Sequence, residues 1–241
     1  MKLSVVVPIF REVTTLEELA RRCSAAARST GLPFEVLFVD DASGDGSAQL
    51  IRSLPASLQL RVLELRHNLG QFRATQAGLA EAEGDVMVVL DGDLQDPPEV
   101  IPALVERHLE DVRNLGRRIT FAVKWKRDDP LWFRLGHYAF RTIQRRVGEG
   151  PPEGAGSFCA MDRALAREVA GVKLKHGNLA WVISALGYVG EWVPYQKQRR
   201  VDGESRVAPL GLVAEALSCL WLVTPAGRNG WRRDAAPKDV R

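Results

Sequence analysis

Three aspartates and a glutamine follow an apolar run of the chain, in the sequence Leu-Asp-Gly-Asp-Leu-Gln-Asp-Pro-Pro-Glu at positions 90–99. Asp91, Asp93 and Gln95 stand two positions apart, and side chains at this spacing on an extended chain point to the same side. Carboxylate and amide oxygens suit Mg²⁺ and Mn²⁺, which keep positions free for water and substrate phosphate. The spacing therefore predicts a divalent-metal site. The alternative is an acidic turn that caps a helix, a role that suits Asp96.

A second acidic segment, Asp40-Asp41-Ala-Ser-Gly-Asp-Gly46, also follows an apolar run. A carboxylate at the end of a strand can accept hydrogen bonds from the N–H groups of a nucleobase. Asp45 and Gly46 are typical turn or cap residues. Taken alone, this segment fits a helix cap as well as it fits base recognition.

Short β-branched runs alternate with helical patterns in the first half of the chain. The expected strands cover residues 3–7, 35–39, 60–65 and 86–90, and the expected helices cover 16–27, 44–54 and 71–82. This alternation predicts an α/β fold with a mostly parallel sheet flanked by helices. Ligands bind beyond the carboxyl ends of such strands. The rule selects residues 8–12, 40–46 and 91–96.

The second half of the chain is less regular. The expected helices cover residues 97–109, 132–147, 162–170 and 178–187, and the expected strands cover 119–123 and 188–193. The composition of residues 148–156 is typical of a loop. We divide the chain into a main α/β domain, residues 1–206, and a C-terminal amphipathic helix with a basic tail, residues 207–241.

Composition limits the class of protein. The chain has 241 residues, 46% of them hydrophobic and 26% charged, which suits one large α/β domain with an appendage. A formal net charge of +3 is too small to indicate nucleic acid binding, so no such partner is expected. Three scattered cysteines favour a reduced, cytoplasmic protein over a disulfide framework. We see neither a signal peptide nor a run of roughly 18 apolar residues that could span a membrane.

Five motifs occur in order along the chain. They are Val5-Val-Val-Pro-Ile-Phe-Arg-Glu12, Phe38-Val-Asp-Asp-Ala-Ser-Gly-Asp-Gly46, Arg66-His-Asn-Leu-Gly70, Leu90-Asp-Gly-Asp-Leu-Gln-Asp-Pro-Pro-Glu99 and Arg200-Val-Asp-Gly-Glu-Ser-Arg206. Together they resemble the inverting family 2 glycosyltransferases of the dolichyl-phosphate mannose synthase and polyprenyl-phosphate glycosyltransferase type. The resemblance covers most of residues 3–206. It implies a GT-A fold and transfer of a sugar from a UDP- or GDP-linked donor.

The resemblance also implies a role for each matching residue. The nucleotide would be bound by Pro8, Phe10, Glu12, Asp40, Asp41, Asp91, Gly92 and Lys124. The metal, Mg²⁺ or Mn²⁺, would be bound by Asp91, Asp93 and Gln95. Catalysis would rest on Asp91, Asp93, Arg200 and Arg206, because a cation and guanidinium groups stabilise the charge that develops on the departing nucleotide.

The acceptor side departs from the family pattern. Where the family has Gly-Asp-Phe-Arg-Leu-Met, this chain has Gly156-Ser-Phe-Cys-Ala-Met161. Ser157 therefore stands in place of an aspartate, and Cys159 stands in place of an arginine. A polyprenyl phosphate is already ionised and needs little base assistance, and it is the acceptor we expect. A small soluble acceptor with a hydroxyl or amine group is the alternative. The acceptor-side candidates are Arg134, His137, Glu153 and Ser157.

The C-terminal segment carries an amphipathic pattern. Apolar residues recur at helical spacing between positions 210 and 221, with arginines on both sides. Such a helix suits the surface of a bilayer, with the protein peripheral at the inner face of the membrane. It suits docking on the core, or on a second subunit of a homo-oligomer, nearly as well.

Two other function classes compete with sugar transfer. A nucleotidyltransferase would need a Gly-rich loop bearing Arg and Lys after the first strand, where Phe10-Arg-Glu12 stands instead. An inert nucleotide-sugar-binding protein is disfavoured by the intact set of Asp91, Asp93 and Gln95. Both are less expected than sugar transfer.

Overall fold

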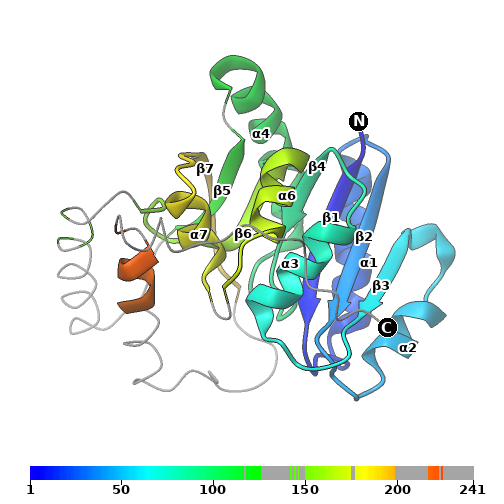
Figure 1. Ribbon diagram of the computed structural model, residues 1–241. Helices are drawn as coiled ribbons and strands as arrows, with labels where there is room; N and C mark the ends of the chain where they lie inside the picture. The colour runs from blue at the N-terminus through cyan, green and yellow to red at the C-terminus, as the bar shows by residue number, and fades with distance from the viewer. Residues whose placement is uncertain are drawn as a thin grey trace.

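The computed structural model describes residues 1–116, 118–125, 142, 144, 146, 150–174, 177–198, 217–222 and 224. Within them, a seven-stranded sheet lies between two layers of helices (Figure 1). The strand order is β3-β2-β1-β4-β6-β5-β7. The predicted α/β class, with a mostly parallel sheet flanked by helices, is confirmed.

The first half of the sheet is parallel. Its strands are β1 (Leu3–Ile9), β2 (Phe34–Asp40), β3 (Leu60–Glu64) and β4 (Val86–Val89). Every residue of β1 is buried, because helices cover both faces of the sheet at this central strand. The uninterrupted apolar run in the sequence reflects this two-sided burial.

The second half of the sheet contains β5 (Ile119–Lys124), β6 (Ala155–Asp162) and β7 (Glu191–Tyr195). Strand β6 runs antiparallel to both β4 and β5, and β7 runs parallel to β5. The loop predicted over residues 148–156 was wrong at its end, because β6 begins at Ala155. Gly154, at φ +81°, and Gly156 gave this stretch a turn-like composition, whereas Ala155 joins the sheet by pairing with the distant Val123 of β5.

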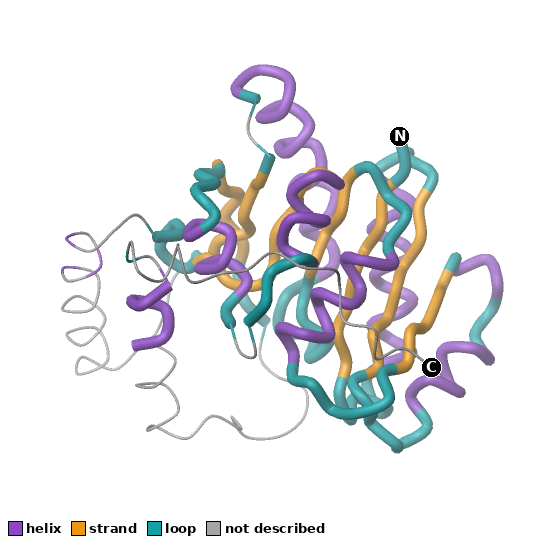
Figure 2. Tube along the Cα trace, in the orientation of Figure 1, coloured by secondary structure: helices purple, strands orange, loops and turns teal. Residues whose placement is uncertain are grey.

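Helices cover the two faces of the sheet (Figure 2). One face packs against α1 (Leu16–Ser29), α2 (Ser47–Ser53) and α4 (Ile101–Leu115). The other packs against α3 (Gln71–Glu81), α6 (Arg163–Ala170) and α7 (Leu179–Ala185). Two short 3₁₀ helices, η1 (Ala56–Leu58) and η2 (Pro98–Val100), precede β3 and α4.

Residues 217–222 are helical and come from the C-terminal segment. Cys219 and Leu222 are buried in the core cluster that contains α3, α6 and α7. Leu217 and Trp221 are 62% and 49% exposed. This turn of helix therefore docks one side on the core and leaves large apolar side chains on the other. Among the described residues, no helix has the length and apolar character to cross a membrane.

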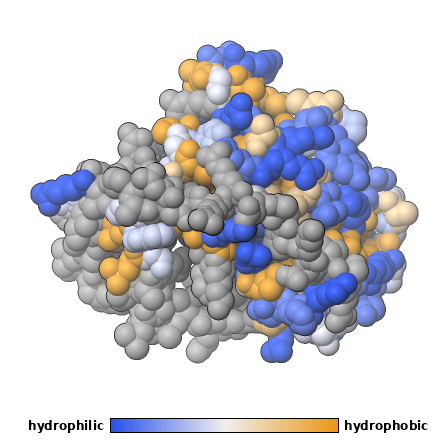
Figure 3. Space-filling view, in the orientation of Figure 1, coloured by the Kyte–Doolittle hydropathy of each residue, from blue (hydrophilic) through white to orange (hydrophobic). Residues whose placement is uncertain are grey.

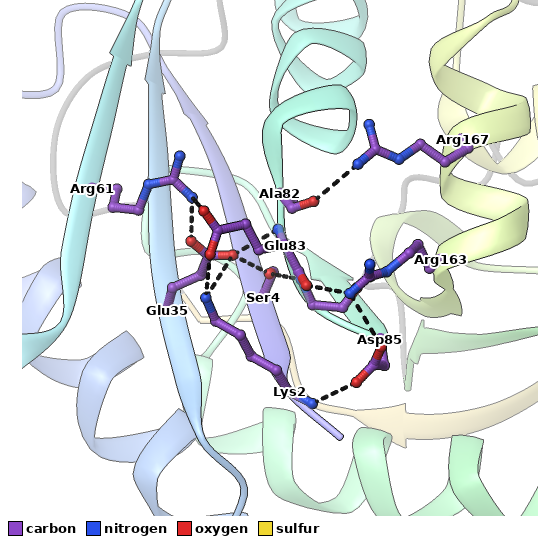
Figure 4. Close-up of polar contacts among 10 residues, drawn as sticks. Lys2, Ser4, Glu35, Arg61, Ala82, Glu83, Asp85, Arg163 and Arg167 are labelled. Carbon is purple, nitrogen blue, oxygen red and sulfur yellow. Dashed lines mark hydrogen bonds and ion pairs between the residues drawn. The ribbon is translucent and has the colours of Figure 1, made fainter.

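A polar network joins the amino ends of the parallel strands (Figure 4). Buried Glu35 accepts hydrogen bonds from the Ser4 hydroxyl (2.5 Å), the Glu83 backbone N–H (2.8 Å) and the Arg61 guanidinium. Burial raises the pKa of Glu35, but the hydrogen bonds from Ser4 and Arg61 outweigh it, and the pKa is lowered overall. The network lies at the edge opposite the strands' carboxyl ends, so it serves stability.

Two arginines of α6 extend this polar surface. Arg163 and Arg167 donate hydrogen bonds to backbone carbonyl groups between residues 80 and 84. Hydrophilic side chains make up much of the described surface around α6 and the strands beside it (Figure 3).

Candidate functional site

A pocket of about 360 Å³ opens at the carboxyl ends of β1 and β4. Its volume lies within the usual range for small-molecule sites. The residues predicted from the sequence that line it are Pro8, Phe10, Glu12, Asp41, Asp91, Gly92 and Asp93. The fold thus brings to one place the three segments that follow β1, β2 and β4, as expected from the rule that ligands bind beyond the carboxyl ends of parallel strands. The role of each residue stays a prediction.

The acidic loop after β4 is a turn and not an extended continuation of the strand. β4 ends at Val89, and Leu94 adopts a left-handed backbone conformation with φ +58°. The expectation that Asp91 and Asp93 share a side because they alternate on an extended chain was therefore wrong. Both still line the same pocket, because the turn folds them toward it.

Gly92 lets this turn approach β1. A Cβ atom at position 92 would lie 2.9 Å from Cγ2 of Ile9 and 3.0 Å from the carbonyl oxygen of Pro8. A backbone carbonyl cannot rotate away as a flexible side chain can. Close contact between the acidic turn and the first loop therefore depends on glycine here.

One oxygen of Asp91 is fully engaged. Its Oδ1 accepts hydrogen bonds from Nε2 of Gln71 (2.6 Å) and from Oγ of Ser157 (2.5 Å). Burial, followed by the negative charges of Asp96 and Asp93, raises the pKa of Asp91 to about 6, although the Ser157 hydrogen bond and Lys124 lower it. The carboxylates are crowded, and a bound cation would relieve their repulsion.

The donor set fits a metal that is shared with a substrate. Among the described residues, no three His, Cys, Asp or Glu side chains gather as a metal cage. Mg²⁺ and Mn²⁺ are often held by one or two carboxylates and completed by substrate phosphate and water, which matches the pair Asp91 and Asp93. Gln95 is not among the pocket-lining residues. Its backbone N–H donates to Oδ1 of Asp93 (3.1 Å), so it braces the turn, and its predicted role as a ligand stays untested.

Asp40 and Asp41 hold two loops in place. Asp40 is 4% exposed, and its Oδ1 accepts a hydrogen bond from the backbone N–H of Ser43 (2.9 Å). Asp41 accepts from the backbone N–H groups of Leu69 (2.7 Å) and Gly70 (2.8 Å) at the start of α3. Burial raises the pKa of Asp41, and these hydrogen bonds offset only part of the rise. Asp41 reaches the pocket and Asp40 is not among its lining residues, so base recognition by Asp40 stays a prediction.

The first loop is tied to the second. The backbone N–H of Arg11 donates to Oγ of Ser43 (3.0 Å), and Arg11 itself has a left-handed φ of +58°. The Arg11 guanidinium lies 5.0 Å from the ring centroid of Phe10, a cation–π contact. This tie fixes the walls of the pocket at Phe10 and Glu12.

Two lysines, Lys124 and Lys197, lie near the acidic turn. Lys124, at the end of β5, lies near β6, since a Cβ atom built on Gly156 would be 3.7 Å from its Nζ. Lys197 follows β7 and is near enough to interact with Lys124 and with Asp91, Asp93 and Asp96. Partial burial and then the charge of Lys124 lower the pKa of Lys197, and the three carboxylates raise it.

The role predicted for Asp96 was wrong. Asp96 is buried and accepts a hydrogen bond from the hydroxyl of Tyr195, and η2 begins without a side-chain cap. The contact spans 99 residues of sequence, so local cap chemistry could not indicate it. It ties β7 to the acidic turn.

The acceptor-side candidates are only partly described. Ser157 lies on β6 and contacts Asp91, and Glu153 lies in the turn before that strand. Arg134, His137, Arg200 and Arg206 lie outside the described residues. Cys159 pairs with Val89 across the sheet and is fully buried, so the position at which the family carries an Arg is core here.

Gln71 and Lys197 were missed by sequence reasoning. Gln71 directly follows the motif Arg66–Gly70, and Lys197 stands three residues before the motif that begins at Arg200. In the sequence, the available signal for both residues was that each stands close to one of the five motifs. The contacts themselves depend on the fold, because Gln71 and Asp91 are separated by 20 residues.

Comparisons with known proteins identify relatives of the chain. Residues 4–170 match the model described as Glycosyl transferase family 2. The undecaprenyl-phosphate 4-deoxy-4-formamido-L-arabinose transferase of Enterobacter sp. (strain 638) is 34% identical over 229 residues, covering 91% of this chain and 67% of that protein.

Solved structures share the fold. The mannosyl-3-phosphoglycerate synthase from Rubrobacter xylanophilus matches with a TM-score of 0.63 at 18% identity, over 92% of this chain and 72% of that one. The glucosyl-3-phosphoglycerate synthase from Mycobacterium tuberculosis, in complex with Mn²⁺, UDP and phosphoglyceric acid, matches with a TM-score of 0.59 at 19% identity, over 95% and 78%. The predicted GT-A architecture is thereby confirmed.

Proposed function

The chain belongs to glycosyl transferase family 2, and from this we propose that it transfers a sugar, with inversion, from a nucleotide diphosphate sugar to a polyprenyl phosphate. The observation that carries the proposal is the pocket at the carboxyl ends of β1 and β4, where Asp91 and Asp93 meet the first loop. An undecaprenyl-phosphate transferase similar over 91% of the chain supports the choice of acceptor.

The described residues account for the donor side. Phe10 and Asp41 line the pocket where a nucleoside would lie, and Asp91 and Asp93 face the same space. These two carboxylates would hold Mg²⁺ or Mn²⁺, which would neutralise the diphosphate and stabilise the charge on the departing nucleotide. Gln71 and Ser157 hold Asp91 in place from two sides.

The acceptor side favours a nucleophile that is already ionised. Position 157, where the family carries an acid, holds a serine whose hydroxyl donates to Asp91. A serine hydroxyl engaged as a donor does not act as a base for an alcohol acceptor. A phosphate oxyanion needs little base assistance, so Ser157 is compatible with a polyprenyl phosphate.

We further propose that the protein works at a membrane surface. Leu217 and Trp221 project from the described turn of helix at 62% and 49% exposure, while Cys219 and Leu222 fasten it to the core. Exposed Leu and Trp on a docked helix suit the boundary between headgroups and acyl chains. A lipid-linked phosphate would meet the enzyme at that surface.

A transfer assay tests the function. Labelled UDP- and GDP-sugars are incubated with the full chain, Mn²⁺ or Mg²⁺, and undecaprenyl phosphate in detergent, with a panel of soluble alcohols in parallel. The proposal predicts label in the lipid phase for one donor. Transfer to a soluble alcohol alone would overturn the lipid acceptor, and no transfer from any donor that binds would favour an inert binding protein.

Vesicle flotation tests the membrane surface separately. Leu217→Glu and Trp221→Glu should reduce binding to anionic vesicles without lowering the melting temperature, because both side chains are exposed. Ser218→Glu, on an exposed neighbouring position, is the matched control. Equal flotation of all variants would show that this turn does not meet the bilayer.

A further inference from the structure

Lys197 lies beside the acidic turn, and its backbone is held from both sides. On one side, the hydroxyl of Tyr195 donates a hydrogen bond to Asp96. On the other, the backbone N–H of Gln198 donates to the carbonyl oxygen of Gln95 (2.9 Å). Residue 197 is therefore fixed over the turn that carries the pocket carboxylates.

A second set of contacts braces the same segment from α1. The Arg22 guanidinium donates to Oε1 of Gln198 (3.2 Å) and is itself held by both oxygens of Glu99, each at 2.8 Å. The backbone around Lys197 is thus anchored, while its side chain keeps contact with solvent and is only partly buried. A long cationic side chain on a fixed backbone beside a pocket is suited to reaching a ligand. The alternative is a charge that only neutralises the neighbouring acids.

Charges of both signs lie around the turn, because Asp91, Asp93 and Asp96 attract Lys197 and Lys124 repels it. Lys197 and Lys124 lie near enough to each other for their ammonium groups to repel. Such repulsion is relieved when an anion binds between them. A cation held by Asp91 and Asp93 would neutralise those two carboxylates, and Asp96 is buried and already accepts the Tyr195 hydroxyl, so an anionic ligand would be the remaining partner of the two lysines.

We propose that Lys197, together with Lys124, binds the diphosphate of the donor. The inference rests on the proposed function, since it names the group that holds the donor's phosphates. An ammonium group offers three hydrogen-bond donors on a compact charge, which suits phosphate oxygens. In this position Lys197 also stabilises the charge that develops on the departing nucleotide.

Nucleotide binding to the full chain tests the role of Lys197. Titration calorimetry with Mn²⁺ compares UDP and GDP with UMP and GMP, for the wild type and for Lys197→Met, Lys197→Arg and Gln196→Ala. The last is the matched control, because Gln196 is the exposed neighbour of Lys197 on the same segment. Melting temperatures verify that all variants fold.

A contact with the diphosphate predicts a selective loss. Lys197→Met should bind the preferred diphosphate about tenfold more weakly and the monophosphate nearly unchanged, as expected for one lost charge-assisted hydrogen bond. Lys197→Arg should recover most of this affinity, and Gln196→Ala should match the wild type. The inference would be overturned if Lys197→Met bound the diphosphate as tightly as the wild type, or if it lost the same affinity for the diphosphate and the monophosphate. Either result would leave the proposed function standing. Failure of the wild type to bind any of these nucleotides would overturn the proposed function as well.

Discussion

The Ser157 hydroxyl donates a hydrogen bond to Oδ1 of Asp91 over 2.5 Å, joining β6 to the acidic turn after β4. The same oxygen accepts from Gln71 of α3. Ligating carboxylates in metal sites are commonly oriented by such hydrogen bonds. Ser157 therefore positions Asp91, although the family pattern has an acid at position 157.

Removing this hydrogen bond should weaken the metal site. Ser157→Ala is expected to lower the affinity for Mn²⁺, measured with nucleotide present, by about 10-fold, the lower end of the effect of such outer contacts. Ser157→Thr keeps the hydroxyl and is the matched control. An unchanged Mn²⁺ affinity in Ser157→Ala would show that Gln71 alone orients Asp91.

Nucleotide binding should depend on pH through Asp91. Burial and the neighbouring carboxylates raise the pKa of Asp91 to about 6, so this group takes up a proton as the pH falls through that value. A protonated carboxyl does not ligate a cation. Affinity for Mn²⁺ with UDP or GDP should be constant above about pH 7 and fall by up to tenfold per pH unit below about 6.

The serine variant sharpens the pH test. The Ser157 hydrogen bond lowers the pKa of Asp91, so Ser157→Ala should move the inflection of the binding curve to higher pH. Titration calorimetry between pH 5 and pH 8 measures both curves. A flat profile for the wild type across this range would contradict the assignment of Asp91 to the metal.

Asp93 should matter more for turnover than for folding. Asp93→Ala removes one of two pocket carboxylates, and loss of such a Lewis-acid site is expected to reduce sugar transfer on the order of 10²-fold or more. The melting temperature should fall only slightly, because the side chain lines the pocket and the substitution removes the hydrogen bond from the Gln95 backbone N–H. Full transfer by this variant in the presence of a chelator would refute metal assistance.

The network at the amino ends of the strands makes a separate prediction about stability. The folded-state pKa of Glu35 is lowered, so its contribution is complete above the unfolded pKa of about 4.5 and is lost as the pH falls through the folded value. Glu35→Gln should reduce the free energy of unfolding at pH 7 by about 1–3 kcal/mol, with the difference shrinking below pH 4.5. Urea denaturation measures it, and Glu110→Gln, an exposed change on α4, is the control.

Much of the parallel half of the fold could be predicted from the sequence. Strands β1, β2, β3 and β4 lie within two residues of the predicted ranges, because each is a short β-branched run bounded by turn residues. The order of these strands places their carboxyl ends together, and so the three segments that line the pocket were found without side-chain contacts. Strand β6 was missed because its first residues are small and because its pairing partners are distant in sequence. Ala155 pairs with Val123 of β5, and residues 159–162 pair with β4.

The site was predicted in position and not in geometry. Asp91 and Asp93 were expected to converge through strand alternation, whereas a turn with a left-handed Leu94 brings them to the pocket. Lys197 and Tyr195 could not be predicted to reach the acidic turn. Their contacts cross about a hundred residues of sequence and follow from the placement of β7 beside β5.

We propose that Asp91 and Asp93 hold a divalent metal that in turn holds a nucleotide diphosphate. A crystal structure of the full chain grown with Mn²⁺ and UDP or GDP, recorded with anomalous scattering from manganese, tests it most directly. We expect an anomalous peak about 2.0–2.4 Å from carboxylate oxygens of Asp91 and Asp93, with the diphosphate on the same ion and the nucleoside against Phe10 and Asp41. A manganese peak elsewhere, or a nucleotide bound away from this pocket, would contradict it.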